Sequence, residues 1–404
     1  MPSRETVIYC TKKYSVNNYV RLPLVAESAS GVWVSDVNGD RYLDMLGVYA
    51  AASCGHNHPK IVSAICEHLK RNGISSMSGG YYSVPYAELV WALTRFCQMD
   101  KVILKTGGSE AFEVAIKIAK RWGYQSKRIP SDCAEIIGCN NNFHGRLPNA
   151  MGLSTEDRYK EDFGPFPLGL KSIPFNDPDA LGRTITRNTA AFVVEPIQGE
   201  GGVNVPEDGY FKEVEKICHR YNVLLIADEI QTGFGRTGYN FAYEHEGVKP
   251  DMLIIAKALG GGLMPVSGVL ASNRIMNLIG PGDEGSTFGS HPLSCVAALE
   301  TLNVLQEERL TEKSRVGGNY LRSELKKIKS PLIKEVRGRG LLVGIELVPG
   351  TDGAKYFRKE LFVRGIICET AGDDKVIRFS PPLIIGKHDL DWAIEQIKKV
   401  FQKG

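Results

Sequence analysis

The sequence predicts an α/β fold with a large domain, whose mostly parallel sheet carries helices on both faces, and a smaller α+β domain made from both chain ends. Short apolar runs alternate with helical patterns between residues 55 and 275, which is typical of a parallel sheet with helical connections. The 404 residues are 43% hydrophobic and 24% charged, enough for a large core. We expect the small domain at 1–50 and 291–404, and the large domain at 51–290.

The first predicted element is a β-hairpin. Asn38-Gly39 stands between two runs of β-type residues in GVWVSDVNGDRYLDML, and this dipeptide is the strongest short-range hairpin signal. We therefore expect a small β element ahead of the large domain.

Six apolar runs then predict the strands of the large domain: KVILKTGG, AEIIGC, AAFVVEP, VLLIADE, DMLIIAK and VSGVLA. After them, a long helical stretch begins with FGSHPLSCVAALETLNVL. Two strands follow, EVRGRGLLVGIEL and KVIRFSPPL, and LDWAIEQIKKV predicts a closing helix. We expect this α+β tail to meet the N-terminal hairpin in space.

Composition and charge restrict the partners. The net charge is +3 with Lys and Arg scattered along the chain, so no basic stripe indicates nucleic acid or anionic lipid. Nine cysteines without a C-x-x-C pair are typical of reduced thiols. The start lacks the apolar core of a signal peptide, and no stretch reaches the roughly 18 apolar residues of a membrane span. We expect a cytoplasmic protein whose partners are small molecules or a second copy.

Candidate chemistry lies at the carboxyl ends of the predicted strands, where ligands bind in open α/β sheets. Thr106–Ser109, Glu195, Asp228 and Lys257 stand there. Asp228 and Lys257 each follow five apolar residues, so burial would favour their neutral forms unless a partner is present. They could form a structural ion pair. Alternatively, an aromatic cofactor could lie between them, with a protonated ring nitrogen at Asp228 and an aldehyde carbon captured by Lys257.

A glycine pair, Gly107-Gly108, separates the first strand from a helix with one apolar face. Free N–H groups at a helix start bind anions, and glycine lets a phosphate approach the backbone, although a plain strand-to-helix turn is the alternative. The spacing matches neither the dinucleotide nor the P-loop pattern. A phosphate pocket, a buried carboxylate and a buried lysine together are the three anchors of pyridoxal phosphate.

A family resemblance is carried by five segments: FVVEPIQGEGG, LLIADEIQTGFGRTG, DMLIIAKALGGG, GSTFGSHPLSC and NNFHGR. The chain resembles the class III, or ω-amino-acid, aminotransferases of the type I pyridoxal phosphate fold. The resemblance runs from about residue 18 to the end, and within the class it is nearest to the ornithine δ-aminotransferases. It implies a mostly parallel seven-stranded sheet, pyridoxal 5'-phosphate as cofactor, and a homodimer or a larger assembly built from dimers.

The resemblance assigns cofactor-binding roles to matched positions. Lys257 would hold the cofactor and move the proton between the substrate carbon and the cofactor carbon, while Asp228 would keep the ring nitrogen protonated. Phe143 would stack on the ring, and Gln231 would lie near its hydroxyl. The other implied cofactor residues are Gly108 and Ser109 at the phosphate, Ile230, Ser286, and Thr287, which would reach the phosphate of the neighbouring subunit.

The implied substrate residues are Tyr19, Tyr49, Arg146, Glu200 and Arg378. The resemblance implies that Arg146 holds the amino acid's carboxylate, with Tyr19 at the α-amino end. Glu200 would pair with Arg378 while a diamino acid is bound, then release it for the carboxylate of 2-oxoglutarate. From the residues alone, Arg378 could be an exposed strand residue and the tyrosines could be simple packing.

Some stretches depart from the ornithine-enzyme pattern: NYVRLP, AAASCGH with Cys54, GGYYSV starting at Gly79, and FGSHP with His291. None touches Lys257 or Asp228, so these departures concern the substrate more than the cofactor. The CGHNHP loop resembles a set of metal ligands, but no second cluster stands at zinc spacing and a similar loop belongs to the aminotransferase pattern. We expect no metal.

The expected reaction moves the terminal amino group of ornithine to 2-oxoglutarate, giving glutamate semialdehyde and glutamate. N-acetylornithine, lysine or 4-aminobutyrate could be the donor within the same chemistry. Some class III relatives are racemases or epimerases that use the same lysine, so that outcome stays open. A nucleotide-binding oxidoreductase or a non-catalytic scaffold on the same sheet is the alternative from another class.

Overall fold

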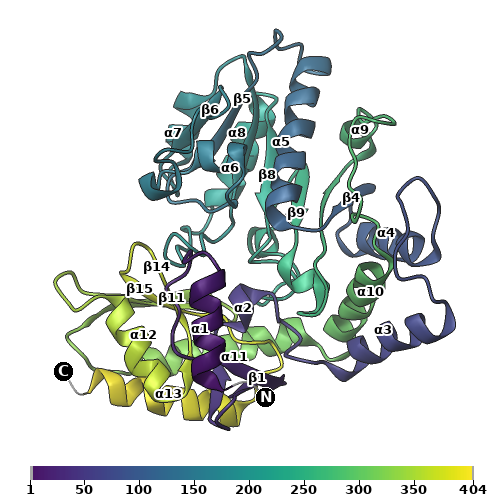
Figure 1. Ribbon diagram of the computed structural model, residues 1–404. Helices are drawn as coiled ribbons and strands as arrows, with labels where there is room; N and C mark the ends of the chain where they lie inside the picture. The colour runs from purple at the N-terminus through teal and green to yellow at the C-terminus, as the bar shows by residue number, and fades with distance from the viewer. Residues whose placement is uncertain (1–2, 403–404) are drawn as a thin grey trace.

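A seven-stranded sheet forms the centre of the computed structural model, which describes residues 3–402 (Figure 1). The strand order is β4-β10-β9-β8-β7-β5-β6, and every neighbouring pair is parallel except the two made by β10. The strands are β4 (Lys101–Lys105), β5 (Glu135–Cys139), β6 (Leu170–Ile173), β7 (Thr189–Val194), β8 (Leu224–Asp228), β9 (Met252–Ile255) and β10 (Ser267–Ala271). The predicted mostly parallel sheet is confirmed.

Strand β6 is the one that the apolar runs did not predict. It is a four-residue edge strand in which only Ile173 is buried, so its sequence LKSI carries no apolar run. The inner strands differ because both faces are covered. All six residues of β7 are buried, for example.

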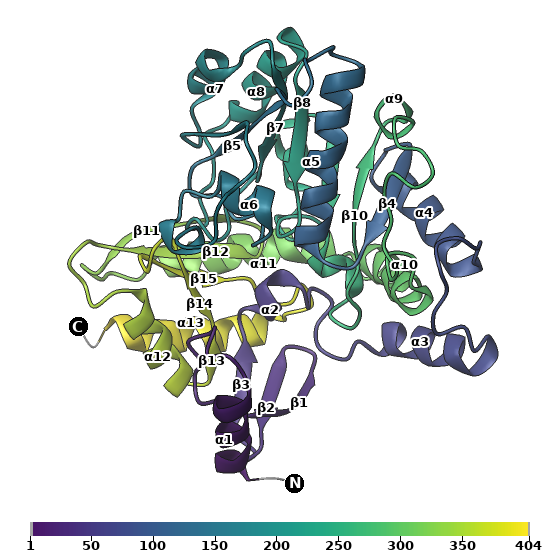
Figure 2. The same ribbon diagram turned by 45° about the horizontal axis from the view of Figure 1, so that its top comes forward.

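Helices cover the two faces of this sheet, as predicted. Helix α5 (Gly108–Gln125) packs on one face with Ile136 and Val193, whereas α8 (Tyr210–Arg220) packs on the other with Ile137 and Phe192. Consecutive strand residues thus point into opposite layers. Figure 2 shows α5 and α8 on opposite sides of β7 and β8. Shorter helices complete the layers: α6 (Pro148–Leu153), α7 (Pro178–Thr184) and α9 (Asn273–Met276).

Three further helices pack together beside β4: α3 (Pro59–Arg71), α4 (Val84–Phe96) and α10 (Pro292–Glu307) (Figure 1). Helix α10 belongs to the predicted long helical stretch but contacts α3 and α4. The remaining short elements are α1 (Arg4–Tyr14), α2 (Gly47–Ala50) and the 3-10 helices η1 (Asp157–Tyr159), η2 (Ala242–Glu246) and η3 (Lys257–Gly260).

The predicted N-terminal hairpin is present, and it joins the C-terminal part of the chain. Its strands are β2 (Trp33–Asp36) and β3 (Arg41–Asp44), with Asp36 accepting the Asn38 and Asp40 N–H groups in the turn. Strand β1 (Ala26–Ser30) pairs with β2, and β13 (Ile366–Ile367) runs parallel to β3. The two chain ends therefore share one sheet (Figure 2).

A third sheet has the order β11-β12-β15-β14 and is antiparallel throughout. Its strands are β11 (Ile333–Arg339), β12 (Leu342–Leu347), β14 (Glu369–Ala371) and β15 (Val376–Phe379). EVRGRGLLVGIEL, expected as one strand, is a hairpin that turns at Gly340, whose φ is +52°. The helices around it are α11 (Leu310–Lys326), α12 (Ala354–Val363) and α13 (Lys387–Phe401). The domain boundaries at 50 and 290 stay a prediction.

Between residues 3 and 402, no helix is both long and apolar enough to cross a membrane. The same residues contain no cluster of three or more potential metal ligands. The two histidines of CGHNHP pair with separate carboxylates: His56 with Asp44 at 2.8 Å and His58 with Glu308 at 3.0 Å.

Candidate active site

A cavity of about 410 Å³ lies at the carboxyl ends of β7, β8 and β9. Its volume is in the range of small-molecule sites, and its position is the usual one in open α/β sheets. It is lined by many of the residues expected from the sequence: Gly108, Ser109, Phe143, Glu200, Asp228, Ile230, Gln231 and Lys257.

Strand register brings Asp228 and Lys257 to the same cavity. Asp228 ends β8 and pairs with Ile254 of β9, while Lys257 comes two residues after the end of β9. Burial lowers the pKa of the Lys257 ammonium, and the charges of Glu200 and Asp228 offset this only in part. A lysine with a lowered pKa is more often the free amine, which is the nucleophilic form.

Asp228 is held by His144, a residue with no role predicted from the sequence. The Asp228 Oδ2 atom lies 2.6 Å from His144 Nδ1, and the Ile230 N–H donates to Oδ1 at 3.1 Å. Burial by itself lowers the pKa of His144, but the hydrogen bond and the charge of Asp228 outweigh it, so the pKa is raised. His144 also stacks on Phe112 with ring centroids 4.5 Å apart. In the sequence, the only indication of a role for His144 is its place in the segment NNFHGR, next to Phe143.

Glu195 lines the cavity beside this pair. The sequence places it at a strand end, and it has no predicted role. Its carboxylate accepts the Phe143 N–H at 3.0 Å and the Gly199 N–H at 3.4 Å. Burial raises the pKa of Glu195 to about 7. Glu195 therefore ties the segment with Phe143 to the segment that leads to Glu200.

Glu229, the second carboxylate after strand β8, serves the fold and does not line the cavity. It accepts the Thr232 hydroxyl at 2.5 Å and the Tyr243 N–H at 2.9 Å, and it is fully buried. Burial raises the pKa of Glu229 to about 7.

Because of this raised pKa, we expect ionisation of Glu229 to lower the stability of the folded protein as the pH rises. Between its unfolded pKa of 4.5 and its folded pKa of about 7, the folded protein binds a proton that the unfolded chain releases, so stability falls as the pH rises through this window. Over this window we expect the free energy of unfolding of Glu229→Gln to fall by about 2–3 kcal/mol less than that of the wild type. Urea unfolding at pH 5 and pH 7.5 measures it, with the exposed Glu207→Gln as control. An unchanged pH dependence in Glu229→Gln would contradict the assignment.

The start of α5 offers an anion site next to the cavity. The N-cap residue is Gly107, and no side chain caps the helix, so its first N–H groups are available to a ligand. Gly145, with φ of +110°, lies so close to Ser109 that an added Cβ would come 2.0 Å from the Ser109 hydroxyl. The backbone is thus packed tightly around Ser109.

Arg378 and Glu200 form a partly buried ion pair at the wall of the cavity. Arg378 on β15 is fully buried, and its Nη1 atom lies 2.6 Å from Glu200 Oε1. Burial opposes ionisation of Glu200, but Arg378 outweighs it and lowers the pKa of the carboxyl. The Arg378 guanidinium lies 5.4 Å from the ring of Tyr49, whose hydroxyl donates to Glu369. Tyr49 and Arg378 are thus close to each other behind Glu200.

The other predicted site residues lie away from the cavity lining. Arg146 is exposed, with its guanidinium 4.4 Å from the Tyr159 ring, and Tyr19 is 63% exposed. Tyr159 lines a second hollow of about 700 Å³, which adjoins the cavity through Phe143 and Glu200. Ser286 and Thr287 lie on the loop that precedes α10, and Thr287 is exposed. The roles of these residues stay predictions.

The chemistry of the cavity fits pyridoxal phosphate. It combines a carboxylate, an amine, the aromatic Phe143 and a helix start. Among the described residues, four buried polar atoms in or behind its wall have no hydrogen-bond partner: His144 Nε2, Gln231 Oε1, and Nε and Nη2 of Arg378. Buried polar atoms without partners are uncommon and indicate a place for a ligand or water.

Comparisons of the sequence with known proteins agree on one family. The sequence pattern of the family described as aminotransferase class-III matches residues 14–401. An ornithine aminotransferase of Halalkalibacterium halodurans is 46% identical over 400 residues, covering 99% of each chain.

Solved structures are similar over the whole chain. The ornithine aminotransferase of Toxoplasma gondii has a TM-score of 0.97 at 38% identity, covering 100% of this chain and 96% of that one. A second structure of that enzyme, described as having partial occupancy of PLP at the active site, has a TM-score of 0.96 at 38% identity, with 99% and 94% covered. An acetylornithine aminotransferase of Elizabethkingia anophelis has a TM-score of 0.89 at 38% identity, with 100% of both chains covered.

Proposed function

The chain belongs to the class III aminotransferases, and from this membership we propose that it transfers the terminal amino group of ornithine to 2-oxoglutarate, giving glutamate semialdehyde and glutamate. The observation that carries the chemistry is the meeting of Lys257 and Asp228 in one cavity. The donor is supported by the names of the full-length relatives.

Residues of this chain have distinct tasks in the reaction. Bound pyridoxal phosphate supplies an electron sink next to the substrate carbon that loses its proton. Lys257 would hold the cofactor through its Nζ atom, and as an amine with a lowered pKa it is suited to carry the proton that leaves the substrate carbon. Asp228, held by His144, would stabilise a proton on the cofactor's ring nitrogen. Phe143 and Ile230 would enclose the ring, and the start of α5 with Ser109 would receive the phosphate.

Glu200 and Arg378 allow one site to take both substrates. While the two are paired, their charges cancel, so the cationic donor meets no free guanidinium. When Glu200 moves away, Arg378 presents an unpaired guanidinium to a carboxylate of 2-oxoglutarate, for which its fork geometry is suited.

A donor panel with the holoenzyme tests this function. L-ornithine, N-acetylornithine, L-lysine and 4-aminobutyrate are each incubated with and without 2-oxoglutarate, and semialdehyde, glutamate and D-isomers are quantified. We expect semialdehyde and glutamate from L-ornithine, with the highest kcat/KM of the panel, and only when the keto acid is present. Faster turnover of another donor would overturn the choice of ornithine, and D-ornithine formed without keto acid would identify a racemase.

We also propose a homodimer in which Thr287 serves the partner's phosphate site. The loop with Thr287 and Phe288 is exposed, and its Ser290 hydroxyl donates to the Met77 carbonyl of a second exposed loop at 3.4 Å. That second loop carries Tyr81 and Tyr82, which are 72% and 105% exposed. Exposed aromatic residues in neighbouring loops favour an interface. Sedimentation equilibrium should give twice the mass of one chain, or a larger even multiple if dimers assemble further, and a fully active monomer would contradict the proposal.

A further inference from the structure

The loop that carries Glu200 has little stiffness of its own. In QGEGGVN, residues 198–204, Glu200 is flanked by three glycines. The ends of the loop are joined by two backbone hydrogen bonds between Gln198 and Asn204, of 3.0 and 3.1 Å. Between these ends, the Gly202 and Val203 N–H groups donate to the Gly199 carbonyl only at 3.4 and 3.3 Å, which is long for a hydrogen bond. Val203 also has a φ of +54°, which is unfavourable for a β-branched residue. The position of Glu200 therefore depends on contacts from outside the loop.

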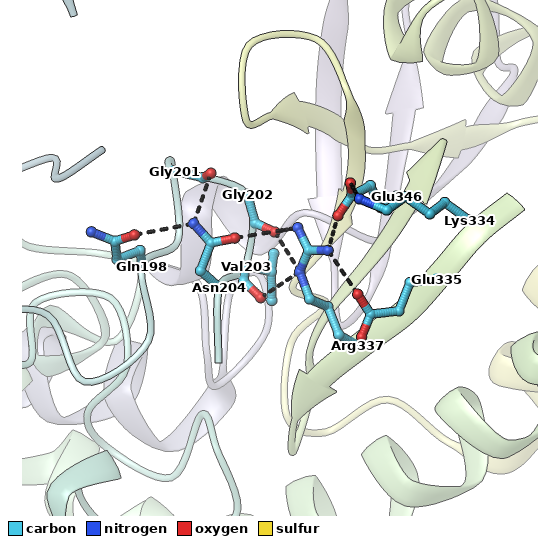
Figure 3. Close-up of polar contacts among 9 residues, drawn as sticks. All are labelled: Gln198, Gly201, Gly202, Val203, Asn204, Lys334, Glu335, Arg337 and Glu346. Carbon is cyan, nitrogen blue, oxygen red and sulfur yellow. Dashed lines mark hydrogen bonds and ion pairs between the residues drawn. The ribbon is translucent and has the colours of Figure 1, made fainter. Parts of the chain in front are cut away.

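The largest set of these outside contacts is made by one residue, Arg337 of β11 (Figure 3). Its Nη2 atom donates to the Gly202 carbonyl at 2.6 Å, and its Nε atom donates to the Gly202 and Val203 carbonyls, both at 3.1 Å. Nη2 also approaches Asn204 Oδ1 at 3.3 Å. The Asn204 amide in turn donates to Gln198 Oε1 and to the Gly201 carbonyl, each at 3.0 Å. One guanidinium thus binds most of the loop's free acceptors.

The guanidinium is itself held from the opposite side. Its Nη1 atom pairs with Glu346 and lies 3.2 Å from Glu335 Oε2. Lys334 binds the other oxygen of Glu346 at 2.5 Å without touching the loop (Figure 3). Because the Arg337 side chain is only 15% exposed, these contacts are largely shielded from water.

Strand register places Arg337 and the substrate-site arginine in one row. Arg337 is paired with Gly344 of β12, and Gly344 is paired with Arg378 of β15. Directly paired residues project to the same face of a sheet. A Cβ at Gly344 would come 3.1 Å from Val203 Cβ, so the loop lies over the glycine, between the two arginines. Arg337 binds the loop's backbone, and Arg378 binds its carboxylate.

We propose that Arg337 is a positioning residue that sets the balance between the two substrates by holding the Glu200 loop against Arg378. The inference rests on the proposed function. With the backbone held, Glu200 can leave Arg378 by side-chain rotation alone and return to the same place. Without Arg337, the loop samples other conformations, Arg378 is uncovered more often, and a cationic donor meets an unpaired positive charge. The Gly372 N–H still binds the Glu200 carbonyl at 2.9 Å, so the loop is loosened but not released.

The test compares Arg337→Met with Lys334→Met in the holoenzyme. Both variants remove a cation bound to Glu346, but only the first removes contacts to the loop. Each half-reaction is followed separately by the cofactor's absorbance, with ornithine as donor and 2-oxoglutarate as acceptor. We expect Arg337→Met to lower the ratio of donor to acceptor kcat/KM by about tenfold, a size reasonable for losing charge-assisted hydrogen bonds. Lys334→Met should leave the ratio within about twofold of the wild type.

A second readout and a second variant separate this role from a general loss of folding. Amide hydrogen exchange of peptides covering 198–204 should be faster in Arg337→Met, whereas peptides from β7 and β8 should be unchanged. Asn204→Ala, which loosens the loop from within, should shift the substrate ratio in the same direction. An unchanged ratio with faster exchange would overturn the inference while leaving the proposed function intact. A wild-type enzyme that does not use ornithine would overturn the proposed function itself.

Discussion

Replacing Lys257 with alanine should lower kcat for transamination by about 10⁴-fold or more. Lys257 is the amine that lines the cavity, and burial lowers its pKa toward the range in which an amine can accept and return a proton. Alanine removes both the covalent attachment and the proton carrier. Steady-state kinetics give the loss, and borohydride reduction followed by peptide mass analysis shows whether the cofactor is still fixed to residue 257.

The control for this change is Lys216→Ala. Lys216 is an exposed lysine on α8 that pairs with Glu213, and it does not line the cavity. It should keep wild-type turnover and the borohydride-stable adduct. A Lys257→Ala enzyme that retained either more than about 1% of kcat or the adduct would show that another amine performs the chemistry.

Asp228→Asn should have the second largest effect, a fall in kcat of about 10²–10⁴-fold, because a neutral amide cannot stabilise a proton on the ring nitrogen as a carboxylate does. The substitution keeps the shape of the side chain, so the loss reports charge. It should also lower the pKa of His144, since Asp228 contributes more than Glu195 to raising this pKa against burial. Kinetics and an NMR titration of the His144 ring protons measure the two effects.

The chain provides a matched control at the next position. Glu229 is as deeply buried as Asp228, but it binds Thr232 and Tyr243 instead of facing the cavity. Glu229→Gln should therefore change the pH dependence of stability and leave kcat within about threefold of the wild type. Equal losses in the two variants would mean that the drop reflects damage to the tip of β8 and not the missing charge.

The apolar runs predicted most of the central sheet and also the place where its chemistry lies. Asp228 and Lys257 directly follow buried strands, so their burial and their position at one sheet edge could be derived from neighbouring residues. The Asn38-Gly39 turn could likewise be predicted from adjacent residues alone. Strand β6 and the turn at Gly340 were missed because a short edge strand carries no apolar run and a hairpin of two apolar strands reads as one.

Contacts between distant segments could not be derived in this way. His144 and Asp228 are 84 residues apart, and the carbonyl of Gly202 is 135 residues from the arginine that binds it. The row of Arg337, Gly344 and Arg378 exists only because β11, β12 and β15 pair in one particular register. Local sequence thus determined which groups would be buried at the strand ends. The tertiary structure decided which of them touch, because a hydrogen bond or ion pair needs its atoms within about 3 Å, and only the packed chain sets such distances.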